Sequence, residues 1–342
     1  MLFSGPPRSL ACTSGTSGGS KLMPVTSSLV LNLLSGVLVL LERQLAAFPG
    51  TSRLQRQMRP VVAPRWRYSS AGVPVGPASV APPGQKDGRE HTQFLYSSPP
   101  AANDIRSEPD AVYVHLLFGL RDRQLGAIEA NFASFVHSVF SALERDWRRL
   151  LRDLAAGRLG ADVDVPESVR AACDAALSPE PGRAAELKAI FESENAFRDG
   201  RLARRVWPHL NFITTVTSGS MRLYASKLQS RYTGQVPLYS ALYAATEGLI
   251  GVNIWPEESR PRYVLHPRAM LFEFAPLASA DRTLLASELQ VGGEYELVVT
   301  NRAGMFRFCM GDVVRVVDFY NSAPVVEFLY RYRALAHNCA TV

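Results

Sequence analysis

The sequence predicts an α/β protein, and three observations support this fold class. A glycine-rich run, TSGTSGGSK at 13–21, precedes an apolar helical segment at 29–41. The rest of the first half carries helical patterns, whereas short apolar runs typical of strands fill the second half. With 342 residues, of which 47% are hydrophobic and 20% charged, the chain can bury one large core or two modest ones.

The apolar segment at 29–41 is too short to cross a bilayer and contains the polar residues Asn32 and Ser35. We therefore expect a buried helix here and no membrane segment in the chain. Residues 51–110 are rich in Pro, Gly and Ser, which predicts long loops around short strands such as RPVVA at 59–63.

Two long apolar patterns follow. Residues 111–120 form a continuous apolar run that fits either a strand or a buried helix. An apolar stripe at spacings of three and four, from Ile128 to Leu154, predicts a long amphipathic helix. Strand-like runs then begin with LNFITTVT at 210–217 and continue with LIGVNIW, RYVLH, AMLFEF, YELVVT, DVVRVV and PVVEFLY.

Charge and cysteine usage exclude several classes of function. The net charge is +6, but the arginines are dispersed, which is typical of a solvated surface and predicts no nucleic-acid partner. The four cysteines have no metal-ligand spacing and the six histidines no H-x-x-x-H pair, so a structural zinc site is not expected. Scattered cysteines also indicate reduced thiols in a cytoplasmic protein.

Three short motifs could carry chemistry. The run at 13–21 is either a flexible linker or a phosphate loop, in which backbone N–H groups, the start of a helix and Lys21 face an anion; it is not a Walker A loop. In YAATEGLIGVN, Thr246 is suited to contact a phosphate and Glu247 to bind a magnesium ion. The alternative is a turn with an exposed glutamate. In FRFCMGDVV, Asp312 is suited to accept hydrogen bonds from ribose hydroxyls. The alternative is that it starts a strand or caps a turn.

Together and in this order, the motifs resemble those of the adenylate-forming superfamily. SGTSGGSKLMP, TSGSMRLYASKL, VPLYSALYAATEGLIGVN and YELVVTNRAGMFRFCMGDVVRVVDFYNSAP are similar to segments of the Gretchen Hagen (auxin-responsive) acyl-acid amido synthetases, closest to the family's animal domain-containing relative. The resemblance covers residues 11 to 330. It implies a large N-terminal domain over 1–330, with β-sheets flanked by helices plus a small β-barrel.

The resemblance also implies parts that this chain lacks. We expect the C-terminal closing domain to be absent, together with part of the helical region ahead of the phosphate loop, and we expect 331–342 to be a tail that does not match. Because the closing domain serves the second half-reaction and brings a catalytic lysine, amide synthesis by this chain is expected to be impaired.

The activity implied is that of an acid–amino acid ligase. Mg²⁺ and ATP would convert a carboxylic acid into an acyl-adenylate, and the amine of an amino acid would then form an amide. Lys21, Thr246 and Glu247 would be catalytic, with Glu247 holding the magnesium ion. The nucleotide would be bound by Ser14, Gly15, Thr16, Ser17, Gly18, Tyr243, Thr246 and Asp312. Ser220 and Met221 would line the substrate pocket.

One departure from the family pattern supports an alternative. Where the family has Y-R-Y-R-x-G-D, this chain has FRFCMGD. Phe306 and Phe308 replace tyrosines and Cys309 replaces an arginine, so two hydroxyls and one cation are lost. The alternative is a catalytically inactive nucleotide-binding or interaction protein with the same fold. Neither the acid, the amine nor the oligomeric state follows from the sequence.

Overall fold

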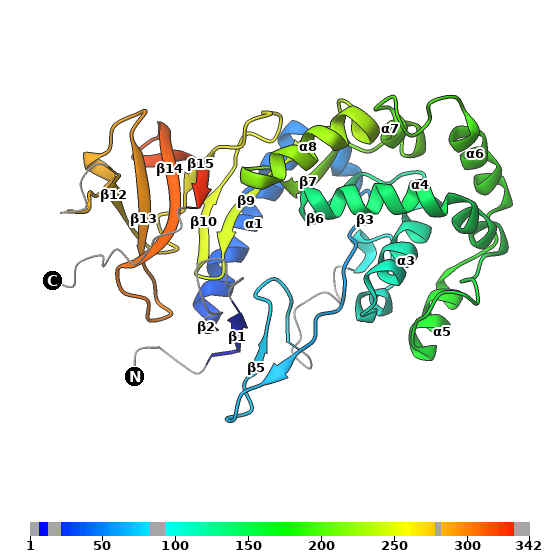
Figure 1. The fold of residues 1–342 in the computed structure, drawn as a ribbon, viewed down its shortest axis with the longest axis horizontal. Coiled ribbons are helices and arrows are strands. Elements are labelled where there is room, and N and C mark those ends of the chain that lie inside the picture. Colours follow the sequence, from blue (N-terminus) through cyan, green and yellow to red (C-terminus); the bar gives the residue numbers. More distant parts are fainter. Residues whose placement is uncertain (1–6, 13–21, 83–92, 278–281, 332–342) are drawn as a thin grey trace. The chain divides into compact units, whose positions relative to one another are not determined.

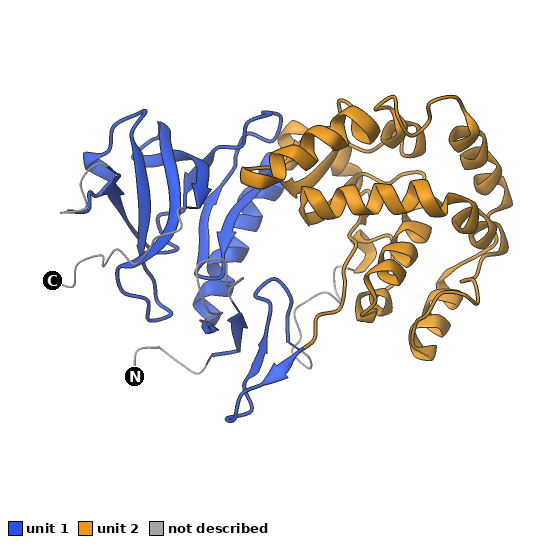
Figure 2. Ribbon diagram, viewed as in Figure 1, with its two compact units in different colours: residues 1–43, 66–85, 240–342 blue, residues 44–65, 86–239 orange. Residues whose placement is uncertain are grey.

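The computed structural model of the 342-residue chain describes residues 7–12, 22–82, 93–277 and 282–331. The chain forms two compact units (Figure 2). Unit 1 comprises residues 1–43, 66–85 and 240–342, and unit 2 comprises residues 44–65 and 86–239. Both units contain sheets and helices, so the predicted α/β class is confirmed (Figure 1).

Unit 2 is built on a four-stranded parallel sheet with the order β3-β6-β7-β8. Helices connect the successive strands, as parallel pairing requires. The strands are β3 (Gln57–Met58), β6 (Ala127–Phe132), β7 (Phe212–Val216) and β8 (Leu238–Tyr239). The helices are α3 (Glu108–Arg121), α4 (Ala133–Ala156), α5 (Glu167–Ala176), α6 (Pro181–Glu192), α7 (Leu202–Val206) and α8 (Arg222–Leu228).

Helix α4 is central to the core of unit 2. It contacts β6 and β7 and packs against α3, α6 and α8, and its apolar stripe from Val136 to Leu154 is buried. The predicted helix is therefore confirmed from residue 133 onward. Its predicted start is wrong, because Ile128 and Phe132 belong to strand β6. Parallel pairing of β6 with β3 and β7 makes this segment a strand, although these two residues also fit a helical spacing.

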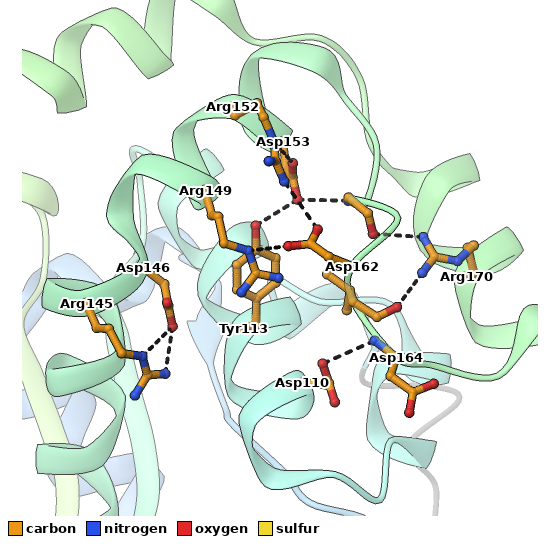
Figure 3. Close-up of polar contacts among 12 residues, drawn as sticks. Asp110, Tyr113, Arg145, Asp146, Arg149, Arg152, Asp153, Asp162, Asp164 and Arg170 are labelled. Atoms are coloured by element: carbon orange, nitrogen blue, oxygen red, sulfur yellow. Dashed lines mark hydrogen bonds and ion pairs between the residues drawn. The ribbon is translucent and has the colours of Figure 1, made fainter.

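A buried carboxylate fixes the loop after α4 (Figure 3). The Asp153 side chain accepts hydrogen bonds from the Tyr113 hydroxyl at 2.7 Å and the Gly160 amide at 2.8 Å. Arg152 donates to its other oxygen at 3.0 Å. Burial, followed by the hydrogen bond to Asp153, raises the pKa of Tyr113 above its ordinary value. The network holds α3, α4 and the following loop together.

Unit 1 contains two sheets. The smaller one has the order β2-β1-β5-β4 and the larger one the order β12-β13-β14-β15-β11-β10-β9. The smaller sheet comprises β1 (Ser9–Cys12), β2 (Leu22–Val25), β4 (Arg67–Tyr68) and β5 (Pro74–Gly76). The larger one comprises β9 (Leu242–Ala245), β10 (Gly248–Val252), β11 (Tyr263–Leu265), β12 (Leu271–Pro276), β13 (Glu294–Thr300), β14 (Phe308–Tyr320) and β15 (Ala323–Arg331).

Several predictions for local structure can now be judged. The strand predicted at 210–217 and those predicted in the second half are confirmed, and 111–120 is helical within α3. The strand predicted at 59–63 is wrong, because β3 ends at Met58 and the following residues are irregular. Among the cysteines, Cys173 is a free thiol as expected, whereas the expectation of a reduced thiol is wrong for Cys309, which is disulfide-bonded.

Helix α1 (Ser27–Ala47) is the predicted apolar helix, but it is not buried. Only Gly36 and Leu40 are fully buried, whereas a stripe of leucines is exposed: Leu31, Leu34, Leu38, Leu41 and Leu45. Among the described residues, α1 is the helix long and apolar enough to cross a membrane, with a mean hydropathy of 1.6, and 11% of that window is buried. Length and composition alone are a weak indication of a membrane span.

Candidate functional site

The glycine-rich run lies between two paired strands of unit 1. Strands β1 and β2 are antiparallel, and Cys12 pairs directly with Leu22. The residues of the predicted phosphate loop, namely Ser14, Gly15, Thr16, Ser17, Gly18 and Lys21, lie outside the described residues.

The predicted helix does not follow the loop directly. Strand β2 comes between them, and α1 begins only at Ser27. The side chain of Thr26 accepts a hydrogen bond from the Leu29 amide at 3.3 Å and so caps the first turn of α1. Because LMPV pairs with β1, the expectation that the loop feeds straight into the helix is wrong.

The second motif forms a tight hairpin. Thr246 and Glu247 are the two residues between β9 and β10, and Ala245 pairs with Gly248 across the turn. Gly248 has φ of +143°, and a Cβ there would lie 2.9 Å from the end of Met270, so the turn requires glycine. The Asn301 side chain donates to the Glu247 carbonyl at 2.8 Å and steadies the turn.

Glu247 lines a hollow of about 280 Å³, part of which is open to solvent. The other polar residues around the hollow include Thr26, Asn32, Asn301 and Arg302. Among the described residues, no three His, Cys, Asp or Glu side chains cluster as a ready metal cage. A single carboxylate at a polar hollow fits Mg²⁺, which takes one or two carboxylates and completes its shell with phosphate oxygens and water.

The third motif places Asp312 in the interior of unit 1. Asp312 lies on β14, opposite Arg331 at the end of β15, and only 3% of it is exposed. The Tyr243 hydroxyl donates to its Oδ2 at 2.8 Å, and Arg331 Nε donates to its Oδ1 at 2.6 Å. A carboxylate has about four lone-pair positions, so these two donors do not use all of the acceptor capacity of Asp312.

Electrostatics join this cluster to the hairpin turn. Burial, and then the charge of Asp312, raises the pKa of Tyr243 well above its ordinary value, so Tyr243 is a neutral donor. The hydrogen bond to Asp312 is the main factor that raises the pKa of Arg331, and the charge of Glu247 adds to it. Asp312, Tyr243, Arg331 and Glu247 therefore share one electrostatic environment.

The structure thus brings some of the predicted site residues together. Tyr243 contacts Asp312, and Thr246 and Glu247 lie on the hairpin that carries Tyr243. Ser220 and Met221 belong to unit 2, in a single turn (Gly219–Met221) that follows β7. Ser220 is exposed, and Met221 packs against the core of that unit.

Arg331 is a residue of the cluster that was not predicted from the sequence, because residues 331–342 were expected to form a tail. No local signal identifies it, because its role depends on the register that pairs β14 with β15. An aspartate in an apolar strand could have prompted a search for a cationic partner, since a buried charge needs one. The partner is then one of several arginines that the sequence does not distinguish.

Comparison with known protein families gives two matches along the chain. Residues 1–238 match the GH3 family N-terminal domain, and residues 263–331 match the GH3 family central domain. The chain belongs to the GH3 family. The resemblance expected from the motifs is confirmed, and GH3 is the family that contains the amido synthetases named below.

Several GH3 proteins are similar to this chain. It is 31% identical to the indole-3-acetic acid-amido synthetase GH3.10 of Arabidopsis thaliana, over 73% of this chain and 45% of that protein. It is 32% identical to a probable indole-3-acetic acid-amido synthetase, GH3.4, of Oryza sativa subsp. japonica, over 96% of this chain and 55% of that protein. The chain spans about half the length of the curated GH3 relatives that it matches.

A solved GH3 structure supports the same fold. The GH3.15 acyl acid amido synthetase superposes with a TM-score of 0.80 at 25% identity, over 94% of this chain and 56% of that one. The same enzyme in complex with 2,4-DB gives a TM-score of 0.81. The fold expected from the resemblance is therefore confirmed as that of a solved GH3 acyl acid amido synthetase.

Proposed function

We propose that this GH3 chain activates a carboxylic acid with ATP as an acyl-adenylate and serves its conjugation to an amino acid. The observation that carries the proposal is the cluster in unit 1, where the Glu247 turn shares one electrostatic environment with Asp312, Tyr243 and Arg331. The family gives the reaction class, because its relatives include indole-3-acetic acid-amido synthetases and a jasmonoyl–L-amino acid synthetase of Nicotiana attenuata.

Each part of the cluster has a task in the first half-reaction. The acid's carboxylate oxygen attacks the α-phosphorus of ATP, and the bond to pyrophosphate breaks. Lys21 and the loop amides would neutralise phosphate charge, and Thr246 would contact the α-phosphate. Asp312 would accept from the ribose hydroxyls while Tyr243 and Arg331 hold it in place. Glu247 would hold Mg²⁺, which supplies charge neutralisation on the phosphates when bound.

The second half-reaction is an acyl transfer. The amine of the amino acid attacks the acyl carbonyl, and AMP leaves as a good leaving group. Amide formation from an acid, ATP and an amino acid, followed by mass spectrometry, tests this part of the proposal, and release of AMP without any amide would contradict it.

Binding of Mg-ATP to the full chain, followed by calorimetry, tests the nucleotide site. Lys21→Ala and Glu247→Gln should each weaken binding by about 1–3 kcal/mol, the range for hydrogen bonds to charged groups. Asp318→Asn is the matched control, because Asp318 is an exposed carboxylate on the same strand as Asp312. Absence of ATP binding by the folded chain would reject the proposal.

A second candidate function is nucleotide binding without turnover. It is favoured by Phe306, which lies just before β14 with 78% of its surface exposed, where the family pattern has a tyrosine. The two candidates differ in pyrophosphate release. ATP binding together with acid-dependent release, tested with indole-3-acetic and jasmonic acids, supports the ligase. ATP binding without release from a broad panel of acids supports the second candidate.

A further inference from the structure

A short loop of unit 1 leads into β14, the strand that carries Asp312. It spans residues 301–305, directly after β13 ends at Thr300. The backbone amide of Asn301 donates to the Met305 carbonyl at 3.0 Å, so the loop is closed on itself. We refer to it as the 301–305 loop.

The Asn301 side chain uses its full hydrogen-bonding capacity. Its Oδ1 accepts from the backbone amides of Ala303 at 2.9 Å and Met305 at 3.2 Å. Its Nδ2 donates to the Glu247 carbonyl at 2.8 Å and to the Met305 sulfur at 3.3 Å. A side-chain amide has two donor and two acceptor positions, and all four have a protein partner here. Asn301 is therefore fixed in one orientation, with its polar groups committed to the protein.

Met305 connects the loop to the strands on either side of the glycine-rich run. Its side chain packs against a small apolar cluster made of Ala11 on β1 and of Met23 and Val25 on β2. The 301–305 loop thus contacts the strands of the first motif through Met305 and the hairpin turn of the second motif through Asn301. Since it also leads into the third motif, it joins all three within unit 1.

The hairpin turn needs such a support if it is to hold a metal ion. Thr246 and Glu247 are the two residues between the paired Ala245 and Gly248, and both are half-buried. A metal ligand has to be kept within about 0.5 Å of its productive position by the residues around it. The hydrogen bond from Asn301 fixes the backbone of Glu247, from which the carboxylate extends.

We propose that Asn301 is a positioning residue for the metal-binding turn, which it holds so that the Glu247 carboxylate can bind Mg²⁺ together with the nucleotide. The inference rests on the proposed function, because it requires Glu247 to be a magnesium ligand. It adds that Asn301 acts through Glu247 and does not touch the nucleotide. The property that Asn301 controls is therefore the magnesium dependence of ATP binding.

Calorimetry of ATP binding to the full chain, with Mg²⁺ and with EDTA, tests this on Asn301→Ser. The serine hydroxyl can still accept a backbone amide two residues further on, which keeps the turn at Ala303. Its side chain is one bond shorter and does not reach the Glu247 carbonyl. The affinity with Mg²⁺ should fall about two- to tenfold, the equivalent of one neutral hydrogen bond. The affinity with EDTA should change by less than about twofold.

Asn253→Ser is the matched control, at the opposite end of the same hairpin. The Asn253 side chain also accepts from an amide two residues further on, that of Trp255 at 3.0 Å, and donates to a distant carbonyl, that of Ser240 at 3.2 Å. This variant loses a comparable bond away from Glu247, so both affinities should stay as in wild type. Urea unfolding establishes that both serine variants are folded.

A double-mutant cycle with Glu247→Gln separates positioning from a general role in the fold. If Asn301 acts through Glu247, Asn301→Ser should have no further effect on ATP affinity in the Glu247→Gln background. A full effect in that background would overturn the inference, as would an unchanged affinity of Asn301→Ser or an equal loss with Mg²⁺ and with EDTA. A wild-type affinity that does not depend on Mg²⁺ would instead reject the magnesium role of Glu247 in the proposed function, and the inference with it.

Discussion

The hydrogen bond between Tyr243 and Asp312 yields the sharpest prediction about stability. Tyr243→Phe removes one hydroxyl and keeps the ring, whose centroid lies 5.5 Å from that of Tyr263 and 5.7 Å from that of Phe328. Packing is therefore preserved, while the Asp312 carboxylate loses one of the two side-chain donors that the described residues supply. Because Asp312 is only 3% exposed, water cannot easily replace the lost hydroxyl.

The expected loss is about 1.5–3 kcal/mol in the free energy of unfolding, the range for a hydrogen bond to a charged group. Urea unfolding at pH 7 measures it, with the fluorescence of Trp255 in unit 1 as one probe. Tyr320→Phe is the matched control, because Tyr320 lies on β14 with 51% of its surface exposed. The control should change stability by less than about 0.5 kcal/mol.

The same pair predicts behaviour at high pH. The pKa of Tyr243 is raised in the folded state, so the stability that its protonated form contributes is complete below the unfolded value of about 10. It is lost as pH rises above that value. In Tyr243→Phe this part of the decline should disappear. A variant whose free energy of unfolding at pH 7 lies within about 0.5 kcal/mol of wild type would refute the reasoning.

Three further predictions concern unit 2, with stability measured by urea unfolding, at pH 7 for the first two and across a pH series for the third. Gly157→Ala should cost about 2 kcal/mol or more, because its φ is +67° and a Cβ would lie 2.2 Å from a backbone nitrogen; Gly182→Ala, with open space around it, should cost almost nothing. Asp153→Asn should cost about 1–3 kcal/mol, whereas Asp162→Asn, at a half-exposed carboxylate, should cost less than about 1 kcal/mol. Stability should fall by up to about 3 kcal/mol as pH drops from 6.5 to 4, because the unfolded chain protonates His115 first, and His115→Gln should flatten that decline.

Local patterns predicted most of the strands, and the failures have physical causes. Short β-branched runs bounded by Gly, Pro and Asp became β10 to β15, since composition and turn signals agree there. The start of α4 was misplaced because Ile128 and Phe132 happen to fit a helical spacing, while pairing with two neighbouring strands makes them part of β6. Tertiary pairing overrides a local period in such cases.

Burial and long-range contacts were the least predictable features. Helix α1 is apolar on several faces, and hydropathy alone does not show which face another element covers; its exposed leucines were therefore expected inside. Tyr243 and Asp312 are 69 residues apart, so the sequence could name both as site residues without showing that they touch. Their contact depends on the order of strands in the seven-stranded sheet.

The contacts of Asp312 change how mutations at this site should be interpreted. Asp312 is held on both sides by protein donors, so its removal disturbs the fold as well as any ribose contact. Loss of ATP binding in an Asp312 variant is therefore ambiguous by itself. Tyr243→Phe separates the two roles, because it weakens the support and leaves the carboxylate in the chain. If it lowers stability while ATP affinity stays within about twofold, well below the 1.4 kcal/mol of a tenfold change, Arg331 suffices to hold Asp312 for the nucleotide. If affinity falls in proportion to stability, the tyrosine hydroxyl is part of the nucleotide site itself.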